Sequence, residues 1–438
     1  MTGALAVAGC GDDKDGSGET TPGITSTLGT TLGDPETGEG EGEGPGEGDG
    51  DKLDMENFDS PIGGNGCPDG SGGGGGMPGE SYSYIWISNS PAGTVSKINT
   101  ATGIEEGRYV AGPGAADPSR TSVNLLGDAV VVDRAGGIAK IAVVEERCVD
   151  SNNNGVIDTS TGPNDVRPWG SDECVLWHLP LPSGGTVTNQ YGPRPVAWEG
   201  IGPVDCANPR VWVGWRDGTT GFFRRINGQT GQIEDSVSVP WLGNQWGPYG
   251  GATNKEGDFW VVGWQYGPLV RIDHANLVPK VYTIPAPPGD TQWTYGMALD
   301  ADGHPWIAGA STVYHFDPDT EQWDFIYVPG ASFRGLMVDA EGRAWVANNG
   351  SSFLVEIDTV SKTVTNPAVP LPGASMPVGI SIDSDGKVWV VDQGASMAFK
   401  VDPDTYQVLL TVSGLVSPYT YSDMTGVGLG LVTFPPAE

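Results

Sequence analysis

One pattern of hydrophobic and polar positions recurs along the chain from residue 84 onward. A turn containing an acidic residue and glycine precedes a short strand in which a tryptophan sits among alternating apolar and small residues, a pattern typical of β-strands. The clearest copies are EGDFWVVG (256–263), DGHPWIAG (302–309), EGRAWVAN (341–348) and DGKVWVVD (385–392), with a weaker copy at NPRVWVGW (208–215). From Trp212 onward these tryptophans are spaced by 48, 46, 39 and 44 residues. YIWISN (84–89) and GDAVVVD (127–133), with Val130 in the tryptophan position, bring the number of copies to seven.

Each copy predicts four strands. A leading strand such as YGMALDADG (295–303) precedes the tryptophan strand, a third strand such as VYHFD (313–317) follows it, and a fourth ends in proline and glycine, as in IYVPG (326–330). Four-stranded repeats of about 40–45 residues without helical periodicity are typical of propeller blades. We therefore predict an all-β, seven-bladed β-propeller over residues 81–438. The first copy lacks a leading strand, and MTGVGLGLVTF (424–434) is expected to supply it and to close the ring.

The repeated D/E-G-x-x-W-V and V-x-K/R-I-D strings resemble those of the streptogramin B lyase-like propellers, and more loosely those of NHL and YVTN repeats, over residues 84–434. For the lyases, the resemblance implies an inward-facing histidine and a Glu-x-His pair that act with magnesium. The histidines of this chain are His178, His274, His304 and His315, and none has a glutamate two residues before it. The repeat alignment places none of them toward the channel, so we predict no catalytic residues of this kind. Propellers of this shape include lyases, lactonases and binding proteins, so the fold leaves the activity open.

Two charged positions recur with the repeat. Aspartate pairs such as Asp300 and Asp302 follow strands, and we interpret them as turn formers rather than metal ligands. The third strands align one polar position, which we expect to form either a solvated edge or a ladder of salt bridges between blades. That position holds Lys97, Lys140, Arg225, Arg271, His315, Glu356 and Lys400.

The N-terminal residues predict export. ALAVAGC (4–10) resembles a bacterial lipobox, in which small residues precede a cysteine that is acylated, here Cys10. No Lys or Arg precedes this short run, so residues 1–10 are expected to be the end of a truncated signal; the alternative is an apolar N-terminus that arises by chance. Residues 11–80 are rich in Gly, Glu and Thr and predict a disordered acidic tether with a span of about 45–50 Å. We therefore expect an outer-membrane or cell-surface lipoprotein, or a periplasmic protein.

Charge restricts the partners. The chain of 438 residues has a formal net charge of −33, and residues 1–80 hold 17 acidic residues against 2 lysines. Binding to phosphate backbones needs clustered Lys and Arg, so we expect no nucleic-acid partner. No stretch reaches 18 continuous apolar residues, so we expect membrane attachment only through the N-terminal lipid. We expect a monomer.

The second copy contains an insert, residues 147–174, with a calcium-type loop. In DSNNNGVID (150–158), side-chain oxygens fall at positions 1, 3, 5 and 9, glycine at 6 and a backbone carbonyl at 7. The loop resembles those of dockerin and thrombospondin type 3 repeats and predicts a structural Ca²⁺ ion. The predicted ligands are Asp150, Asn152, Asn154, Val156 and Asp158. Position 12 is Thr161, so Asp165 or Asp172 would have to compensate; the alternative is an asparagine-rich turn without metal.

The cysteines agree with export. Cys148 and Cys174 bracket the calcium-type loop, and we expect a disulfide there that stabilises the fold by about 3–4 kcal/mol. With Cys10 assigned to the lipid, a Cys67–Cys206 disulfide follows by elimination.

The loops that lead into the innermost strands share one face of a propeller with the loops between second and third strands. Here they are rich in aromatic residues, whose flat rings suit sugar rings or extended peptides. The candidate ligand-binding residues are Tyr191, Trp246, Tyr249, Trp293, Tyr295, Arg334 and Tyr421. Alternatively, these rings pack between blades and plug the channel. We expect a surface-tethered binding protein for a glycan, peptide or protein; the alternative is a lyase or lactonase-type enzyme with a non-standard divalent metal site.

Overall fold

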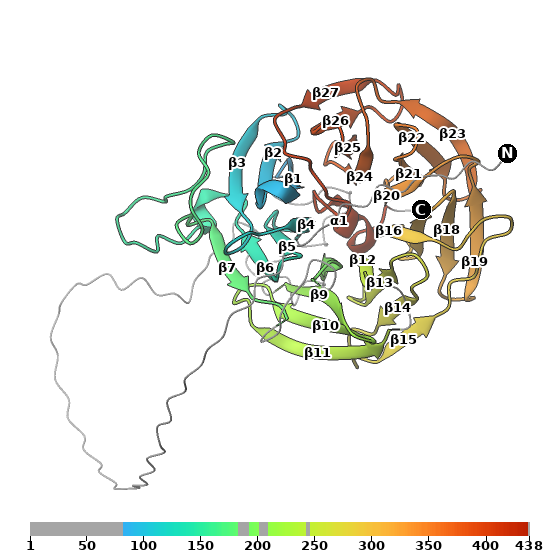
Figure 1. Cartoon of the computed structure of the whole chain (residues 1–438), viewed down its shortest axis with the longest axis horizontal. Helices are drawn as coiled ribbons and strands as arrows, with labels where there is room; N and C mark the ends of the chain where they lie inside the picture. Colours follow the sequence, from blue (N-terminus) through green and yellow to red (C-terminus); the bar gives the residue numbers. More distant parts are fainter. Residues whose placement is uncertain (1–81, 183–191, 201–208, 242–245, 437–438) are drawn as a thin grey trace, which may run out of the picture. The chain divides into compact units, whose positions relative to one another are not determined.

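The computed structural model describes residues 82–182, 192–200, 209–241 and 246–436. They form seven antiparallel sheets arranged radially around a central channel (Figure 1), which confirms the predicted seven-bladed β-propeller. The predicted signal (1–10) and tether (11–80) lie outside the described residues, as do Cys10, Cys67, Tyr191 and Cys206. Among the described residues, no helix is long and apolar enough to span a membrane.

In every blade the strands follow the chain order from the channel outward, and blade one has three strands of its own. Blade one contains β1 (Tyr84–Asn89), β2 (Thr94–Asn99) and β3 (Glu105–Val110), and blade two β4 (Pro118–Val123), β5 (Ala129–Asp133), β6 (Gly137–Ile141) and β7 (Val175–Leu179). Blade three contains β8 (Val196–Trp198), β9 (Arg210–Asp217), β10 (Thr220–Asn227) and β11 (Ile233–Pro240), and blade four β12 (Pro248–Thr253), β13 (Phe259–Gly263), β14 (Leu269–Ile272) and β15 (Pro279–Tyr282). Blade five contains β16 (Thr294–Leu299), β17 (Pro305–Gly309), β18 (Thr312–Asp317) and β19 (Gln322–Tyr327). Blade six contains β20 (Phe333–Val338), β21 (Arg343–Asn348), β22 (Phe353–Asp358) and β23 (Thr363–Pro370), and blade seven β24 (Pro377–Ile382), β25 (Val388–Asp392), β26 (Met397–Val401) and β27 (Val408–Val412).

The repeated tryptophans form the core of the blades. They lie on the second strand of each sheet and are fully or almost fully buried, and Val130 takes the same place in blade two. The turn that precedes each of these strands needs a left-handed residue, and glycine supplies it, for example Gly303 at φ +81° and Gly386 at φ +69°. The repeat seen in the sequence therefore corresponds to one blade, the unit that packs around its own buried tryptophan or valine.

The aligned polar position on the third strands is buried, so the predicted solvated edge is wrong. Strand register places Lys400 directly opposite Trp389. The Asp383 carboxylate accepts hydrogen bonds from the Trp389 indole at 2.9 Å and pairs with the Lys400 ammonium at 2.8 Å. Equivalent ion pairs within one blade join Lys140 to Asp128, Arg225 to Glu199, and Arg271 to Asp258. These four cations therefore pair within their own blade and do not form the predicted ladder between blades, whereas the partly buried Lys97 donates to the Val143 carbonyl of blade two.

The first aspartate of each recurring pair does form the turn, as predicted. Oδ1 of Asp383 accepts hydrogen bonds from the backbone N–H groups of Asp385 and Lys387 at 3.0 and 2.9 Å. Its other oxygen holds the tryptophan and the cation, so one carboxylate joins the turn to the core of the blade.

The predicted closing strand at residues 424–434 is wrong. Residues Val427–Thr433 form a helix, α1, which lies in the middle of the ring (Figure 1). A helix satisfies the backbone hydrogen bonds of this segment internally, and it packs against the inner strands β12, β16 and β24. The preceding residues take the inner position of blade one instead: Tyr419 N–H donates to the Ser88 carbonyl, and Trp86 N–H donates to the Met424 carbonyl, both at 2.9 Å.

Close backbone approach confirms where the ring closes. A β-carbon at Gly379, on the inner strand of blade seven, would lie 1.7 Å from the carbonyl oxygen of Thr420. One at Gly335 in blade six would similarly lie 2.7 Å from the carbonyl oxygen of Val378 in blade seven. Thr420 therefore occupies the place that an inner strand fills in the other blades, and the C-terminal segment joins blades seven and one.

Candidate functional site

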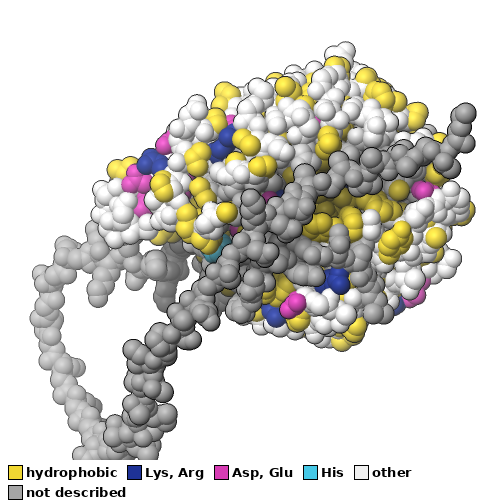
Figure 2. All heavy atoms as spheres, in the orientation of Figure 1, with side chains coloured by type: hydrophobic (Ala, Val, Ile, Leu, Met, Phe, Trp, Pro, Cys, Tyr) yellow, Lys and Arg dark blue, Asp and Glu magenta, His cyan; other side chains and the backbone are white. Residues whose placement is uncertain are grey.

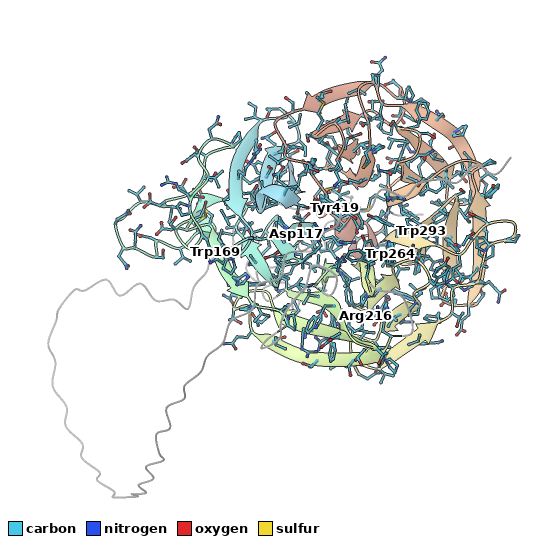
Figure 3. The ribbon with its side chains drawn as sticks, in the orientation of Figure 1. Asp117, Trp169, Arg216, Trp264, Trp293 and Tyr419 are labelled. Atoms are coloured by element: carbon cyan, nitrogen blue, oxygen red, sulfur yellow. A yellow bond between two sulfur atoms is a disulfide. The ribbon has the colours of Figure 1, made fainter. Side chains whose placement is uncertain are left out.

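One end of the channel is filled by an aromatic cluster. It consists of Trp246, Tyr249, Trp264, Trp293, Tyr295, Tyr419 and Tyr421. Figure 3 shows Trp264, Trp293 and Tyr419 near the axis of the ring, where they converge from separate parts of the chain. Tyr249, Tyr295 and Tyr421 are at most 6% exposed, whereas the three tryptophans are only partly buried. The tyrosines therefore plug the channel, and the tryptophans form its accessible rim.

The tyrosines contact one another closely. The ring centres of Tyr295 lie 4.9 Å from Tyr249 and 4.8 Å from Tyr421. The hydroxyl of Tyr419 is 3.0 Å from that of Tyr249 and also contacts that of Tyr295. Such edge and offset contacts add about 0.5–1.5 kcal/mol per pair beyond simple burial, so the plug is well ordered.

Four arginines stack on this cluster, and one of them, Arg134, lies 5.1 Å from the ring centre of Tyr419. The guanidinium carbon of Arg120 lies 3.9 Å from the ring centre of Tyr421 and 4.4 Å from that of Tyr249. Arg194 lies 4.8 Å from Trp246. Arg334 lies 4.9 Å from Trp293 and 5.0 Å from Tyr295. Guanidinium groups over aromatic faces interact favourably, and more strongly when desolvated.

The position of these side chains follows from the repeat. Arg194, Tyr249, Tyr295 and Arg334 each stand five residues before the residue that begins the turn after the inner strand. Because the inner strands converge on the axis, one position in the repeat delivers four large side chains to one end of the channel. Tyr419 and Tyr421 come from the C-terminal segment that replaces the missing inner strand.

Burial and charge shape the ionisation of the plug. Burial lowers the pKa of Arg120 to about 10, so it remains charged at neutral pH. Burial would raise the pKa of Tyr249, but the nearby Arg120 and Arg194 guanidiniums lower it below its ordinary value. Burial raises the pKa of Tyr295, as does the neighbouring Tyr249. Arg120 and Arg334 have no ion-pair partner within the described part of the chain, so positive charge dominates this end of the channel.

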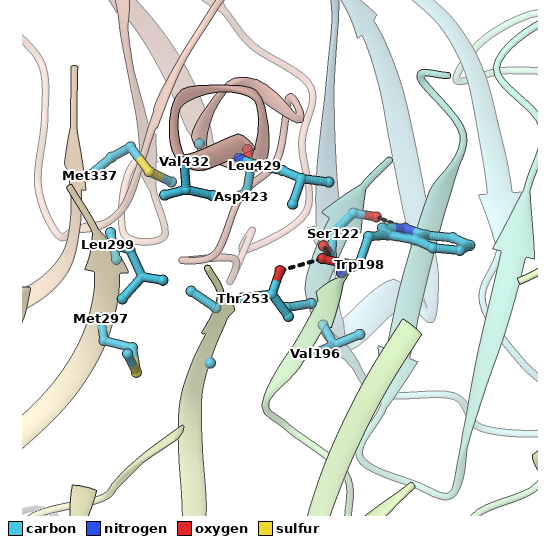
Figure 4. Close-up of a pocket in the computed structure, with 15 residues that line it drawn as sticks. Ser122, Val196, Trp198, Thr253, Met297, Leu299, Met337, Asp423, Leu429 and Val432 are labelled. Atoms are coloured by element: carbon cyan, nitrogen blue, oxygen red, sulfur yellow. Dashed lines mark hydrogen bonds between the residues drawn. The ribbon is translucent and has the colours of Figure 1, made fainter. Parts of the chain in front are cut away.

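A small cavity lies deeper in the channel, between the inner strands and α1 (Figure 4). Ser122, Thr253, Met297, Met337 and Leu429 are among its lining residues. Its volume of about 30 Å³ holds about two water molecules and no organic ligand of useful size. A ligand of this propeller would therefore bind outside the tyrosine plug.

The calcium-type insert brings its predicted side chains together. The side-chain amides of Asn152 and Asn154 both lie 2.9 Å from Oδ2 of Asp158. Oδ2 of Asp150 accepts the N–H of Gly155, which has φ +83°. The Asn152 and Asn154 amides lower the pKa of Asp158. The loop therefore gathers its predicted side chains, with the Asn152 and Asn154 amide nitrogens facing Asp158 and their oxygens accepting the N–H groups of Asn154 and Val156.

The acidic residue at the base of this loop is Glu173, which sequence reasoning missed. Its Oε1 accepts the N–H of Ser151 at 2.8 Å, and its Oε2 accepts the N–H of Asp158 at 2.8 Å. Asp172 instead accepts hydrogen bonds from Thr159 and Ser160, and Asp165 from Thr161. Neither replaces an acidic position 12.

The predicted Cys148–Cys174 disulfide is present, with the two Cα atoms 4.4 Å apart. It brings residue 173 beside residues 149–151, where the Val149 N–H donates to the Glu173 carbonyl. The sequence signal that could have placed Glu173 at the base of the loop was therefore its position next to Cys174.

The structure also places the predicted ligand-binding residues. Trp246, Tyr249, Trp293, Tyr295, Arg334 and Tyr421 all belong to the channel end described above, and Tyr191 lies outside the described residues. Arg120, Arg194 and Tyr419 were missed. Comparing the weak second and third repeats with the strong ones at the inner-strand position could have found the two arginines.

Among solved structures, a streptogramin B lyase shares this fold, with 17% sequence identity, a TM-score of 0.53, and coverage of 72% of this chain and 88% of that chain. A functionally unknown protein from Desulfotomaculum acetoxidans DSM 771 is also similar, with 11% identity, a TM-score of 0.52, and coverage of 78% and 99%. The expected likeness to the streptogramin B lyase-like propellers is thus confirmed for the fold. No family model and no curated protein sequence matches the chain. At these identities the likeness does not assign an activity.

Proposed function

We propose that this protein is an exported, surface-tethered binding protein that presents the rim of its aromatic cluster to a glycan, peptide or protein. The observation that carries the proposal is the pairing of the partly exposed Trp293 with Arg334, 4.9 Å apart, above a buried tyrosine floor. A flat ring supplies stacking area, and a guanidinium supplies directed hydrogen bonds to carboxylate or hydroxyl oxygens. Because the tyrosines of the plug already contact one another closely, ligand binding should cost little conformational entropy at this surface.

Charge favours binding over metal-dependent catalysis at this end of the channel. The cationic side chains that stack on the aromatic cluster are Arg120, Arg134, Arg194 and Arg334, whose charges repel a divalent cation. In a protein of net charge −33, a local group of arginines favours ligands that carry carboxylates. Acidic glycans and acidic peptides are therefore the first ligands to test. The lyase or lactonase alternative would need its metal elsewhere.

The test is a binding screen of neutral and acidic oligosaccharides and peptides, followed by calorimetry on the hits. Trp293→Ala and Arg334→Gln should each weaken binding by at least about tenfold, the loss expected for one stacking or charged contact. The matched control is Tyr327→Ala, an exposed aromatic residue on outer strand β19, which should leave affinity unchanged. Equal affinity in all three variants, or no binding by the wild-type protein, would reject the proposal.

The calcium-type insert is proposed to hold a structural Ca²⁺ ion. Support comes from the convergence of Asp150, Asn152, Asn154 and Asp158, and from the left-handed Gly155 at position 6. Calcium should raise the melting temperature of the wild-type protein, because only the folded loop gathers the ligands. The Asp150→Ala/Asp158→Ala variant should melt at the same temperature with calcium and with chelator. A calcium-dependent shift that persists in this variant would place the ion elsewhere.

Lipid attachment at Cys10 is likewise part of the proposal. Expression in a bacterial host with labelled palmitate should label the wild-type chain and not the Cys10→Ser variant. Label in both, or in neither, would argue against the predicted lipobox.

A further inference from the structure

Blade five differs from its neighbours at two charged positions of the repeat. His315 lies opposite Trp306, in the place that Lys400 takes opposite Trp389 in blade seven. His304 follows the turn glycine, as Lys387 does in blade seven. In blade seven the two lysines pair with Asp383 and Asp402 at 2.8 and 2.7 Å. Blade five keeps the carboxylates and replaces both lysines with histidines.

The two histidines and their carboxylates lie close together. The ligand atoms of Asp300, His304 and His315 are all within 4.8 Å of one another. Those of His304, Asp317 and Asp319 form a second group within 4.8 Å that shares His304. In a tetrahedral zinc site with bonds of about 2.0–2.2 Å, two ligand atoms lie about 3.3–3.6 Å apart. Shifts of about 1–1.5 Å would therefore bring the first group into coordination.

His315 is already oriented for coordination. Its Nδ1 lies 3.0 Å from Oδ2 of Asp324, and its Nε2 faces Oδ2 of Asp300 at 3.9 Å. A carboxylate on Nδ1 fixes the tautomer that leaves the Nε2 lone pair for a metal. Lys362 pairs with the same Asp324 carboxylate and holds it in place. Asp300 is held by the Trp306 indole at 2.9 Å and by the His304 N–H at 2.9 Å.

Charge balance points the same way. Without the lysines of blade seven, the carboxylates of Asp300, Asp317 and Asp319 lack a full positive charge. A divalent cation would supply it, and the partly exposed His304 and exposed Asp319 leave the group open to solvent.

We propose that blade five binds a divalent transition metal, best matched by Zn²⁺, through His304, His315 and Asp300, with a carboxylate of Asp317 or Asp319 as the fourth ligand. Two imidazole nitrogens with carboxylates suit zinc, whereas calcium prefers oxygen ligands alone. The metal would clamp the turn between β16 and β17 to the turn between β18 and β19. It is independent of the calcium-type insert and of the channel-end binding site.

The experiment titrates untagged full-length protein with Zn²⁺ in the presence of millimolar Ca²⁺, in competition with a chromogenic chelator. We expect one tight site per chain in the wild type. The His304→Lys/His315→Lys variant restores the residues of blade seven, so it should fold with an unchanged melting temperature in chelator. It should bind Zn²⁺ at least about 100-fold more weakly. The control, His178→Ala on outer strand β7, should bind as the wild type does.

Cobalt provides the spectroscopic readout. Co²⁺-loaded wild-type protein should show the visible absorption of a tetrahedral nitrogen and oxygen site, and the double lysine variant should not. Wild-type protein without a tight Zn²⁺ site would overturn the proposal. So would a double lysine variant that binds Zn²⁺ as tightly as the wild type, because the ion would then bind elsewhere.

Discussion

The carboxylate of Asp383 offers a direct test of how each blade is held together. Asp383 is 1% exposed, and its Oδ2 lies 2.9 Å from the Trp389 indole nitrogen and 2.8 Å from the Lys400 ammonium. Replacing it with alanine leaves a buried ammonium whose remaining partners are the Thr100 carbonyl at 2.9 Å and the exposed Asp385 carboxylate at 3.7 Å. Breaking a buried pair from one side costs about 3–5 kcal/mol. The stranded indole N–H is included in that range, because contributions at one site are not additive.

Removing both charges should cost less. In Asp383→Ala/Lys400→Met, no buried charge remains unpaired, so we expect a loss of about 1–3 kcal/mol from the unsatisfied indole and the lost packing. The matched control is Asp385→Ala. The Asp385 side chain is 61% exposed and lies 3.7 Å from the same ammonium, so its loss should cost less than about 1 kcal/mol.

The assay is urea unfolding followed by tryptophan fluorescence and circular dichroism, whose transitions must coincide for a free energy to be defined. The reasoning would be refuted if Asp383→Ala cost no more than Asp385→Ala. It would equally fail if the double variant were less stable than Asp383→Ala, because the unpaired charge would then not be the source of the loss.

Three further predictions follow from burial and backbone contacts. Gly379→Ala should destabilise the fold by at least about 2 kcal/mol in urea unfolding, because its β-carbon would lie 1.7 Å from the Thr420 carbonyl oxygen. Cys148→Ser/Cys174→Ser should cost about 3 kcal/mol and lower the melting temperature measured by calorimetry, since the disulfide closes a separation of 26 residues. Burial raises the pKa of Tyr314 to about 12, above its ordinary value, so its stabilising effect is complete below pH 10 and lost as pH rises toward 12. Urea midpoints measured across that range should therefore fall more in the wild type than in Tyr314→Phe.

Each of these three predictions would be contradicted by a specific result. Gly430→Ala in α1 is the control for the glycine variant, since a β-carbon there meets nothing within 4 Å, and equal losses would mean that close approach is not the cause. A reduced wild-type protein as stable as the oxidised one would remove the disulfide argument. Parallel alkaline profiles for the wild type and Tyr314→Phe would show that another group controls the loss.

Much of the blade could be predicted from sequence because it is local. The tryptophan, the turn glycine and the alternating strand residues lie within about ten positions of one another, so one copy defines a unit and seven copies define a ring. The Cys148–Cys174 disulfide was predictable for the same reason, since the two cysteines bracket one short insert, whereas Ca²⁺ binding by the loop stays a prediction. Glu173 escaped because the disulfide, not the spacing, brings it to the loop.

The channel could not be predicted in the same way. VGLGLVT (427–433) has the alternation of a strand, yet it is a helix that packs against the inner strands β12, β16 and β24 of three different blades. The aligned cations of the third strands looked solvated, yet strand register buries Lys400 opposite Trp389 and beside Asp383. Arg120 contacts Tyr421 although 301 residues separate them in the chain.

The sequence by itself thus determined the repeated blade, the number of blades and the disulfide of the insert, because those depend on contacts between near neighbours. Only the tertiary structure decided what fills the channel, which charges are buried together and how the two ends of the described chain meet. Those features depend on side chains from different blades, and these side chains become neighbours only when the ring closes.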